Sequence, residues 1–297
     1  VYRFRKMVRF KLLRKFFLQR MISSGNKIQL NTTIDLSPVD FLHWDYEEFD
    51  RYVQDLMNNR IKFFGREFDL SSCNDWLTDP VTGGKWKLDY FNNVDYRRPD
   101  CPGDPKVIWE INRHQHLILL GIAFRKNGDE AFAQKIVDSI LTWIDSNPLL
   151  MGINWVSPLE LAVRIISWTF SLNLIAGSKA LTEAARDKIA ESVFQQTNFI
   201  YNNLSLYSSS NNHLVGELAG LIFGSYLITG SGKENKWRDK AVTFLEEQVS
   251  NQFYSDGVNK EQTISYQCFT LEFYLLSLYM LKRNGGTFKE RVLYSLS

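Results

Sequence analysis

The stretch NNHLVGELAGLIFGSYLI, residues 211–228, decides the fold because it is an almost uncharged apolar helix. From Leu214 to Ile228 only Glu217 carries a charge. A helix without a polar face must be covered by other elements. Yet this one opens with two asparagines and His213, whereas a helix start needs only one capping residue. The sequence therefore predicts an interior helix whose first turn has a role beyond capping.

Similar segments extend on both sides of this helix. After Pro105, apolar residues recur at helical spacing, and Gly, Pro and Asn-Gly positions separate the segments. We expect helices near 106–126, 129–146, 157–176, 182–204, 212–229, 234–252 and 261–283.

The expected helices alternate between two types. Those beginning near 106, 157, 212 and 261 are apolar, whereas the intervening helices carry a charged face. The apolar type recurs about every 50 residues, which is typical of helix pairs stacked into a solenoid or closed into a ring. We therefore predict an all-α fold of antiparallel hairpins that curl into an open ring, with apolar helices inside and charged helices outside.

The first third of the chain differs from the rest. Residues 1–105 are rich in turn-forming Asp, Asn, Gly and Pro, with one helix expected near 45–59. We predict an irregular lead-in with little β-structure that wraps the helical domain formed by residues 106–297.

Charge and cysteine content narrow the class of protein. The net charge is +2, but residues 1–20 contain eight Lys or Arg and no acid. This basic segment would either dock on the main domain or contact an anionic membrane surface. It contains no uninterrupted apolar run typical of a signal peptide. Elsewhere in the chain, no uncharged apolar stretch is long enough for a transmembrane helix. The three cysteines are too widely spaced to indicate a disulfide framework or a metal motif.

Polar residues gather at the start of each apolar helix. Parallel inner helices of a ring begin on one rim, so these clusters are expected to meet in one cleft, where helix N-termini favour anions. An ordinary alternative exists for each residue, such as a salt bridge within one helix or a buried ring. The candidates are Asn112, Arg113 and His116 in the first cluster, Asn154, Trp155, Glu160 and Arg164 in the second, Asn212, His213 and Glu217 in the third, and Glu261 and Tyr266 in the fourth.

Common catalytic motifs are missing from the sequence. It contains no HExxH zinc motif, no phosphate-binding glycine loop and no GxSxG nucleophile elbow. Paired carboxylates remain available for hydrolysis from Glu110, Glu160, Glu217 and Glu261, although their spacing singles out no pair.

Four segments in this order resemble the heparinase II/III family of polysaccharide lyases, and the resemblance extends over roughly residues 60 to 285. They are WEINRHQHLILLGIAF at 109–124, GDEAFAQKIVDSILTWIDSNPLLMGINWVSPLELAVRIISW at 128–168, NNHLVGELAGL at 211–221 and DGVNKEQTISYQCF at 256–269. It implies an incomplete (α/α) toroid followed by an antiparallel β-sandwich, which we expect in the full-length protein after Ser297. It also implies cleavage of uronic-acid-containing polysaccharide by β-elimination.

The resemblance also implies roles for individual residues. The family's Asn/His pair at a helix start matches Asn212 and His213, and its catalytic tyrosine matches Tyr266. The other candidates are then expected to bind substrate, with no metal and no organic cofactor. The implied partner is an acidic polysaccharide (heparan-like, alginate-like or a bacterial exopolysaccharide) and not a nucleic acid. The implied compartment is the periplasm or the exterior, with the cytoplasm as the alternative.

Two other classes stay open at this point. One is a helical-ring glycoside hydrolase that uses two glutamates and a water molecule, which would leave no new double bond. The other is a non-catalytic module that binds glycan and leaves its length unchanged.

Overall fold

A computed structural model describes residues 25–34, 46–71, 75–207 and 210–296. The basic segment 1–20 lies outside these ranges, so its contact with a membrane surface stays a prediction. Within the described ranges, no helix is both long and apolar enough to cross a membrane.

Helices dominate the chain after Asp104, and most of their bounds match the expected ones. They are α4 (Pro105–Asn112), α5 (His116–Asn127), α6 (Glu130–Ser146), α7 (Pro158–Leu174), α8 (Glu183–Asn202), α9 (Asn212–Leu227), α10 (Glu234–Gln252), α11 (Ile264–Arg283) and α12 (Glu290–Ser295). Short 3-10 turns lie at Phe91–Asn93 and Ile153–Trp155.

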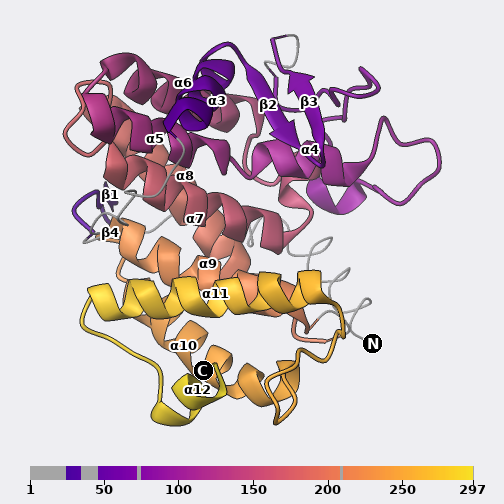
Figure 1. Ribbon diagram of the computed structural model, residues 1–297, viewed down its shortest axis with the longest axis vertical. Coiled ribbons are helices and arrows are strands. Elements are labelled where there is room, and N and C mark those ends of the chain that lie inside the picture. The colour runs from indigo at the N-terminus through magenta and orange to yellow at the C-terminus, as the bar shows by residue number, and fades with distance from the viewer. Residues whose placement is uncertain (1–24, 35–45, 72–74, 208–209, 297) are drawn as a thin grey trace.

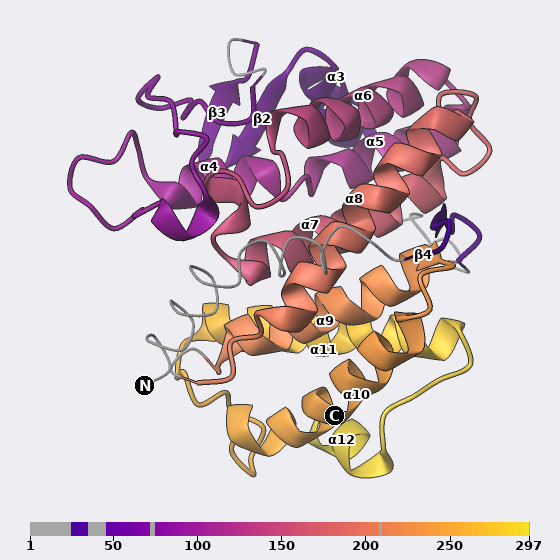
Figure 2. The same cartoon turned by 180° about the vertical axis from the view of Figure 1, so that it is seen from behind.

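The helices form two layers that follow the predicted alternation. The apolar helices α5, α7, α9 and α11 pack side by side in chain order, and α6, α8 and α10 cover them. Figure 1 shows this succession from α5 and α6 at one end to α10 and α12 at the other, and Figure 2 shows α8 from behind. The prediction of an all-α fold is confirmed, and the arrangement is an incomplete α/α toroid.

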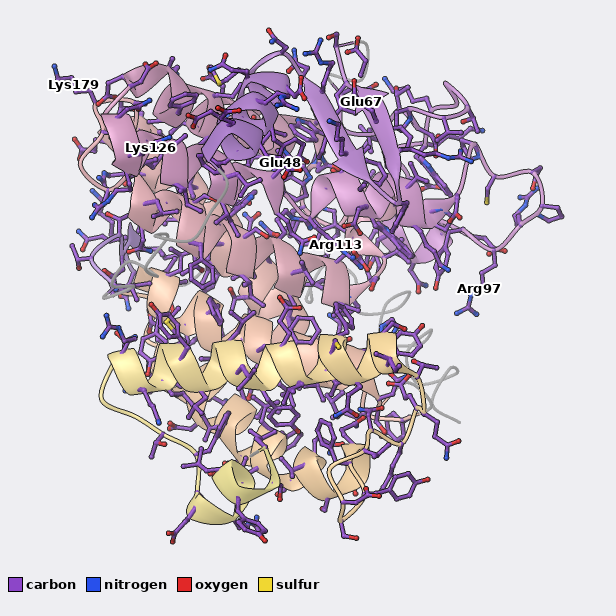
Figure 3. All side chains as sticks on the ribbon, viewed as in Figure 1. Glu48, Glu67, Arg97, Arg113, Lys126 and Lys179 are labelled. Carbon is purple, nitrogen blue, oxygen red and sulfur yellow. The ribbon has the colours of Figure 1, made fainter. Side chains whose placement is uncertain are left out.

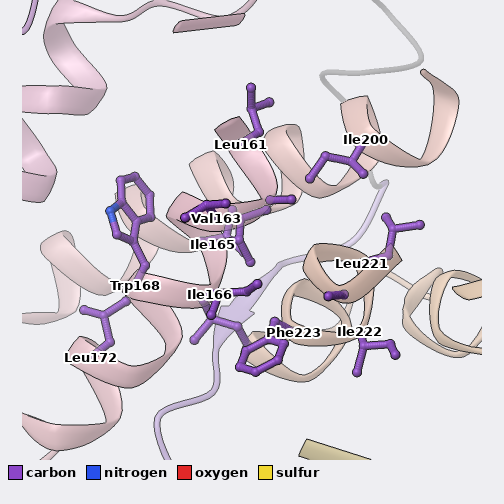
Figure 4. Close-up of a cluster of buried hydrophobic side chains, with 14 of the residues drawn as sticks. Leu161, Val163, Ile165, Ile166, Trp168, Leu172, Ile200, Leu221, Ile222 and Phe223 are labelled. Atoms are coloured by element: carbon purple, nitrogen blue, oxygen red, sulfur yellow. The ribbon is translucent and has the colours of Figure 1, made fainter. Parts of the chain in front are cut away.

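Helix α9 lies at the centre of the packing, as its composition predicted. It contacts α7, α8, α10 and α11. Its side chains Leu221, Ile222 and Phe223 join residues of α7 and α8 in one buried cluster (Figure 4). Three glycines, Gly216, Gly220 and Gly224, let neighbouring helices approach closely, because a Cβ at any of them would overlap an adjacent side chain.

One helix expected from the sequence is in fact two. The segment 106–126 breaks at Arg113–Gln115 between α4 and α5, although it contains neither Pro nor an early Gly. His114 adopts a left-handed conformation there, with φ of 59°, and its side chain is fully buried. A non-glycine residue rarely takes this conformation, so tertiary contacts of His114 override the helical preference of the segment.

The lead-in contains more regular structure than predicted. Helix α3 (Tyr46–Met57) is present as expected, but β2 (Arg60–Phe63) and β3 (Arg66–Asp69) form an antiparallel hairpin that the sequence reading missed. Both turn residues, Phe64 and Gly65, have positive φ, as a tight two-residue hairpin requires.

A second strand pair joins the lead-in to the toroid. The short strand β1 (Gln29–Leu30) pairs antiparallel with β4 (Ile228–Thr229), which directly follows α9. The lead-in therefore reaches the central helix, as a segment wrapping the toroid would.

Candidate active site

Arg113, which follows the last residue of α4, links the break between α4 and α5 to the start of α7. Its Nε donates to Oε2 of Glu160 at 2.8 Å, and one terminal nitrogen donates to Oε1 of the same carboxylate at 3.2 Å. The other terminal nitrogen donates to Glu110 at 2.8 Å. Burial alone would lower the pKa of Arg113, but the two carboxylates raise it by more, so the net shift is upward. Arg113 therefore stays charged and is already paired with two carboxylates. Its side chain is labelled in Figure 3.

The start of α9 is linked in the same way to the segment before α11. Asn212 is 4% exposed, and its Nδ2 donates to both carboxylate oxygens of Glu261 at 2.8 and 2.9 Å. The backbone N–H of Asn212 donates to the same carboxylate at 3.2 Å, and Nδ2 of Asn211 lies 3.5 Å from it. A carboxylate at this position is favoured because the first N–H groups of a helix lack partners inside the helix.

His213 connects these two groups of residues electrostatically. Its pKa is lowered from 6.5, chiefly by burial and also by Arg113, while Glu160 and Glu261 act in the opposite direction. The imidazole is therefore neutral at neutral pH, when it can give or accept a proton. These interactions place Arg113, Glu160 of α7 and Glu261 before α11 within electrostatic range of His213 at the start of α9. A single concave surface shared by all the predicted clusters stays a prediction.

Several predicted substrate-binding residues lie beneath this surface rather than on it. Arg164 is 0% exposed, its guanidinium lies 3.9 Å from the centre of the Trp143 ring, and it donates to Gln196 and to the backbone carbonyls of Asn112 and Asn154. Burial lowers the pKa of Arg164 to about 9. Its donors are thus used inside the protein, which corrects the expectation of an exposed cation.

Asn112 and Asn154, which were predicted to line the cleft, form a buried network with Arg164. Asn112 accepts from Trp143 Nε1 at 2.8 Å and from Asn154 Nδ2 at 2.9 Å, and both asparagines donate to the carbonyl of Trp76. Trp155 is also buried and donates to the carbonyl of Asn147 at 3.2 Å. The structure places all three in the interior, where they hold the rim in shape and do not form an open surface.

Glu217 is buried and His116 is only partly exposed. The carboxylate of Glu217 is buried and accepts from the backbone and hydroxyl of Ser205 at 2.7 Å each, so it anchors the loop before α9. His116 lies at the start of α5, where burial and then Lys135 lower its pKa to about 4. Neither is placed like the exposed substrate contacts that the sequence suggested.

Tyr266 is the most accessible of the predicted catalytic residues. It lies in the first turn of α11 and is 45% exposed. Its backbone N–H is capped by Thr263 Oγ1 at 3.2 Å, and its hydroxyl makes no hydrogen bond within the described ranges. The phenol is thus free to meet a ligand.

Asn211 and His114 belong to the polar clusters seen in the sequence, but no role was assigned to either. Asn211 caps α9 by accepting from the His213 N–H at 3.3 Å and also faces Glu261. Its place directly before an apolar helix was the available signal. His114 is buried against Trp168, whose Nε1 donates to its Nδ1 at 2.9 Å, and no sequence signal indicates that contact. Within the described ranges, no three His, Cys, Asp or Glu side chains are grouped to hold a metal ion.

Comparison with known protein families identifies the family to which this chain belongs. The sequence model described as Heparinase II/III N-terminus matches residues 52–290, which is most of the chain. The chain belongs to the heparinase II/III family. The resemblance read from its helix starts is thereby confirmed.

Curated relatives and solved structures of heparinase II/III proteins agree with this assignment. A heparin-sulfate lyase from Pedobacter heparinus is 24% identical over 61% of this chain and 28% of its own length, and one from Bacteroides thetaiotaomicron is 28% identical over 53% and 22%. The crystal structure of heparan sulfate lyase from Pedobacter heparinus has a TM-score of 0.62 at 19% identity, over 90% of this chain and 40% of that one. A crystal structure of heparinase III has a TM-score of 0.57 at 17% identity, over 90% and 45%. The chain thus matches less than a third of each curated relative and under half of each structure.

Proposed function

We propose that the full-length protein is a polysaccharide lyase that cleaves uronic-acid-containing chains of the heparin or heparan sulfate type by β-elimination. The main support is the start of α9, where Asn212 binds Glu261 and the neutral His213 lies within electrostatic range of Glu160 and Arg113 from other elements. The relatives named as heparin-sulfate lyases support this substrate class.

The reaction places specific demands on such a site. A base removes the proton from C5 of the uronate, the C4–C5 double bond forms, and the C4–O4 bond breaks, after which O4 takes up a proton. The negative charge that develops on the uronate carboxylate must be stabilised by preorganised donors. A donor at the N-terminus of a helix suits this role because the helix dipole favours added negative charge.

The described residues suggest a division of these tasks. In this proposal Asn212 donates to the uronate carboxylate, and Tyr266 exchanges protons with C5 and O4. His213 is available as a second acid–base group because its lowered pKa keeps it neutral at neutral pH. The further domain expected from the resemblance remains part of the proposal.

The hydrolase alternative receives little support from the glutamates. A glycosidase needs two carboxyl groups facing the bond to be broken. Glu110 and Glu160 both bind Arg113, and Glu261 binds Asn212. Each of these carboxylates is held by a protein donor, so none is presented as a free acid or nucleophile.

The first prediction tests the type of reaction. Incubation of the full-length protein with heparan sulfate should shorten the polymer while ultraviolet absorbance grows, because elimination leaves a double bond conjugated to the carboxylate. Polymer length and absorbance are followed together. Shortening without absorbance would indicate hydrolysis, and binding without shortening would indicate a glycan-binding module.

The second prediction concerns Tyr266. Tyr266→Phe removes only the hydroxyl, so the fold should survive while the rate falls about 10²–10⁴-fold, as for the loss of an acid–base group. Tyr279→Phe, the same change at the far end of α11, is the matched control and should keep full activity. Full activity in folded Tyr266→Phe would remove Tyr266 from the mechanism.

A further inference from the structure

Glu261 takes a position that its expected role as a substrate contact does not explain. Its carboxylate already accepts from the side chain of Asn212 at 2.8 and 2.9 Å and from the backbone N–H of Asn212 at 3.2 Å. Nδ2 of Asn211 adds a longer contact of 3.5 Å. A carboxylate that already accepts these hydrogen bonds at a helix N-terminus has little capacity left to bind a sugar hydroxyl.

The contact fixes which end of the Asn212 amide faces the carboxylate. An ionised carboxylate can only accept hydrogen bonds, so the nitrogen of the amide, and not its oxygen, must face Glu261. The orientation of an asparagine amide is otherwise set only by its surroundings. Glu261 therefore selects one of the two flipped states of Asn212.

The same geometry leaves one N–H of Asn212 for a ligand. The two N–H bonds of a planar amide diverge widely, whereas the two oxygens of one carboxylate lie close together. A single N–H therefore points between both oxygens of Glu261, and the second N–H has no acceptor among the described residues. If the amide were flipped, its oxygen would replace this N–H and repel a uronate carboxylate.

We propose that Glu261 is a positioning residue that locks the side-chain amide of Asn212 with one N–H directed toward the substrate. This inference rests on the proposed elimination reaction for its kinetic consequences, but the orientation of the amide can be tested without any reaction. Glu261 acts through Asn212 and does not touch the reacting atoms.

The kinetic test is a double-mutant cycle in the full-length protein. Asn212→Ala should lower kcat on the order of 10²-fold, and Glu261→Ala should lower kcat by a smaller factor with little change in KM. The double variant should be no slower than Asn212→Ala alone, because Glu261 has nothing left to orient. Independent, multiplying losses would overturn the proposal and assign Glu261 a direct role.

Two further variants separate orientation from general damage. Glu261→Gln keeps an oxygen that can accept from Asn212 and should recover much of the lost rate. Lys260→Ala removes a neighbouring side chain whose Nζ donates to the Ser250 carbonyl at 2.7 Å, and it should leave kcat unchanged. A loss in Lys260→Ala equal to that in Glu261→Ala would indicate simple disruption of the segment and contradict the proposal.

A second measurement is independent of activity. In protein labelled with ¹⁵N-asparagine, the side-chain resonances of Asn212, identified by their loss in Asn212→Ala, should include one proton protected from exchange. Protection should disappear in Glu261→Ala and persist in Glu261→Gln. Unprotected protons in the unaltered protein would refute the orienting contact, whereas protection without any elimination activity would refute only the proposed reaction.

Discussion

At the scale of single residues, Arg164 is a cation used entirely within the protein. Its guanidinium lies over Trp143 and donates to Gln196 and to two backbone carbonyls in the interior. The sequence placed it one turn after Glu160 and could not distinguish a surface ion pair from this buried fork. Three different nitrogens of the planar guanidinium donate to these three acceptors, a spread that a compact ammonium does not have.

Arg164→Lys should therefore reduce stability and leave the chemistry intact. An ammonium cannot reach all three acceptors, and unpaired buried acceptors should lower the free energy of unfolding by about 2–4 kcal/mol. Denaturant unfolding would measure the loss, with Arg125→Lys on the exposed end of α5 as the control. A raised KM for polysaccharide at unchanged stability would instead restore the original expectation that Arg164 binds substrate.

At the scale of elements, the sequence predicted α9 well and the break between α4 and α5 not at all. The apolar composition of α9 is a local property, so it could be read directly. The break at His114 depends on a contact with Trp168 far along the chain, which no local pattern contains. The hairpin of β2 and β3 was missed because its turn signal is weak. Of the two turn residues, Phe64 and Gly65, only the glycine favours positive φ.

Gly220→Ala tests the close packing of α9 against α7. Alanine is a better helix former by up to about 1 kcal/mol, yet the added Cβ would overlap both Cα and Cβ of Ala162. We expect overpacking to prevail and to lower the free energy of unfolding by about 1–3 kcal/mol. Gly177→Ala, where a Cβ meets nothing within 4 Å, is the control. Equal stability of the two variants would show that α9 and α7 can move apart freely.

At the scale of the whole molecule, the meeting of the helix starts was predictable but the depth of each residue was not. Parallel inner helices in a ring must begin on one side, which follows from the repeat alone. Whether Asn112 or Asn154 lies on that surface or beneath it depends on the lead-in, whose Trp76 carbonyl accepts from both side chains. The irregular lead-in offered no pattern from which this covering could be inferred.

The two histidines at the break between α4 and α5, His114 and His116, should make the stability of the protein depend on pH. Burial holds the pKa of His114 well below 6.5 and lowers that of His116 to about 4, and the nearby cations Arg164 and Lys135 act in the same direction. In the unfolded chain both imidazoles return to ordinary values near 6.5. Between pH 6.5 and about 4 the unfolded state therefore binds more protons, so the free energy of unfolding must fall as the pH is lowered.

Thermal unfolding measured from pH 7 to pH 4.5 would test this, with His116→Gln as the comparison. Carboxylates with lowered pKa, such as Asp75, also destabilise the protein in acid, so the unaltered chain alone is not decisive. The variant keeps the acidic groups and removes one imidazole of lowered pKa, and its unfolding midpoint should therefore fall less steeply with acid. Parallel curves would mean that His116 is protonated equally easily in both states, which its position beside His114 should prevent.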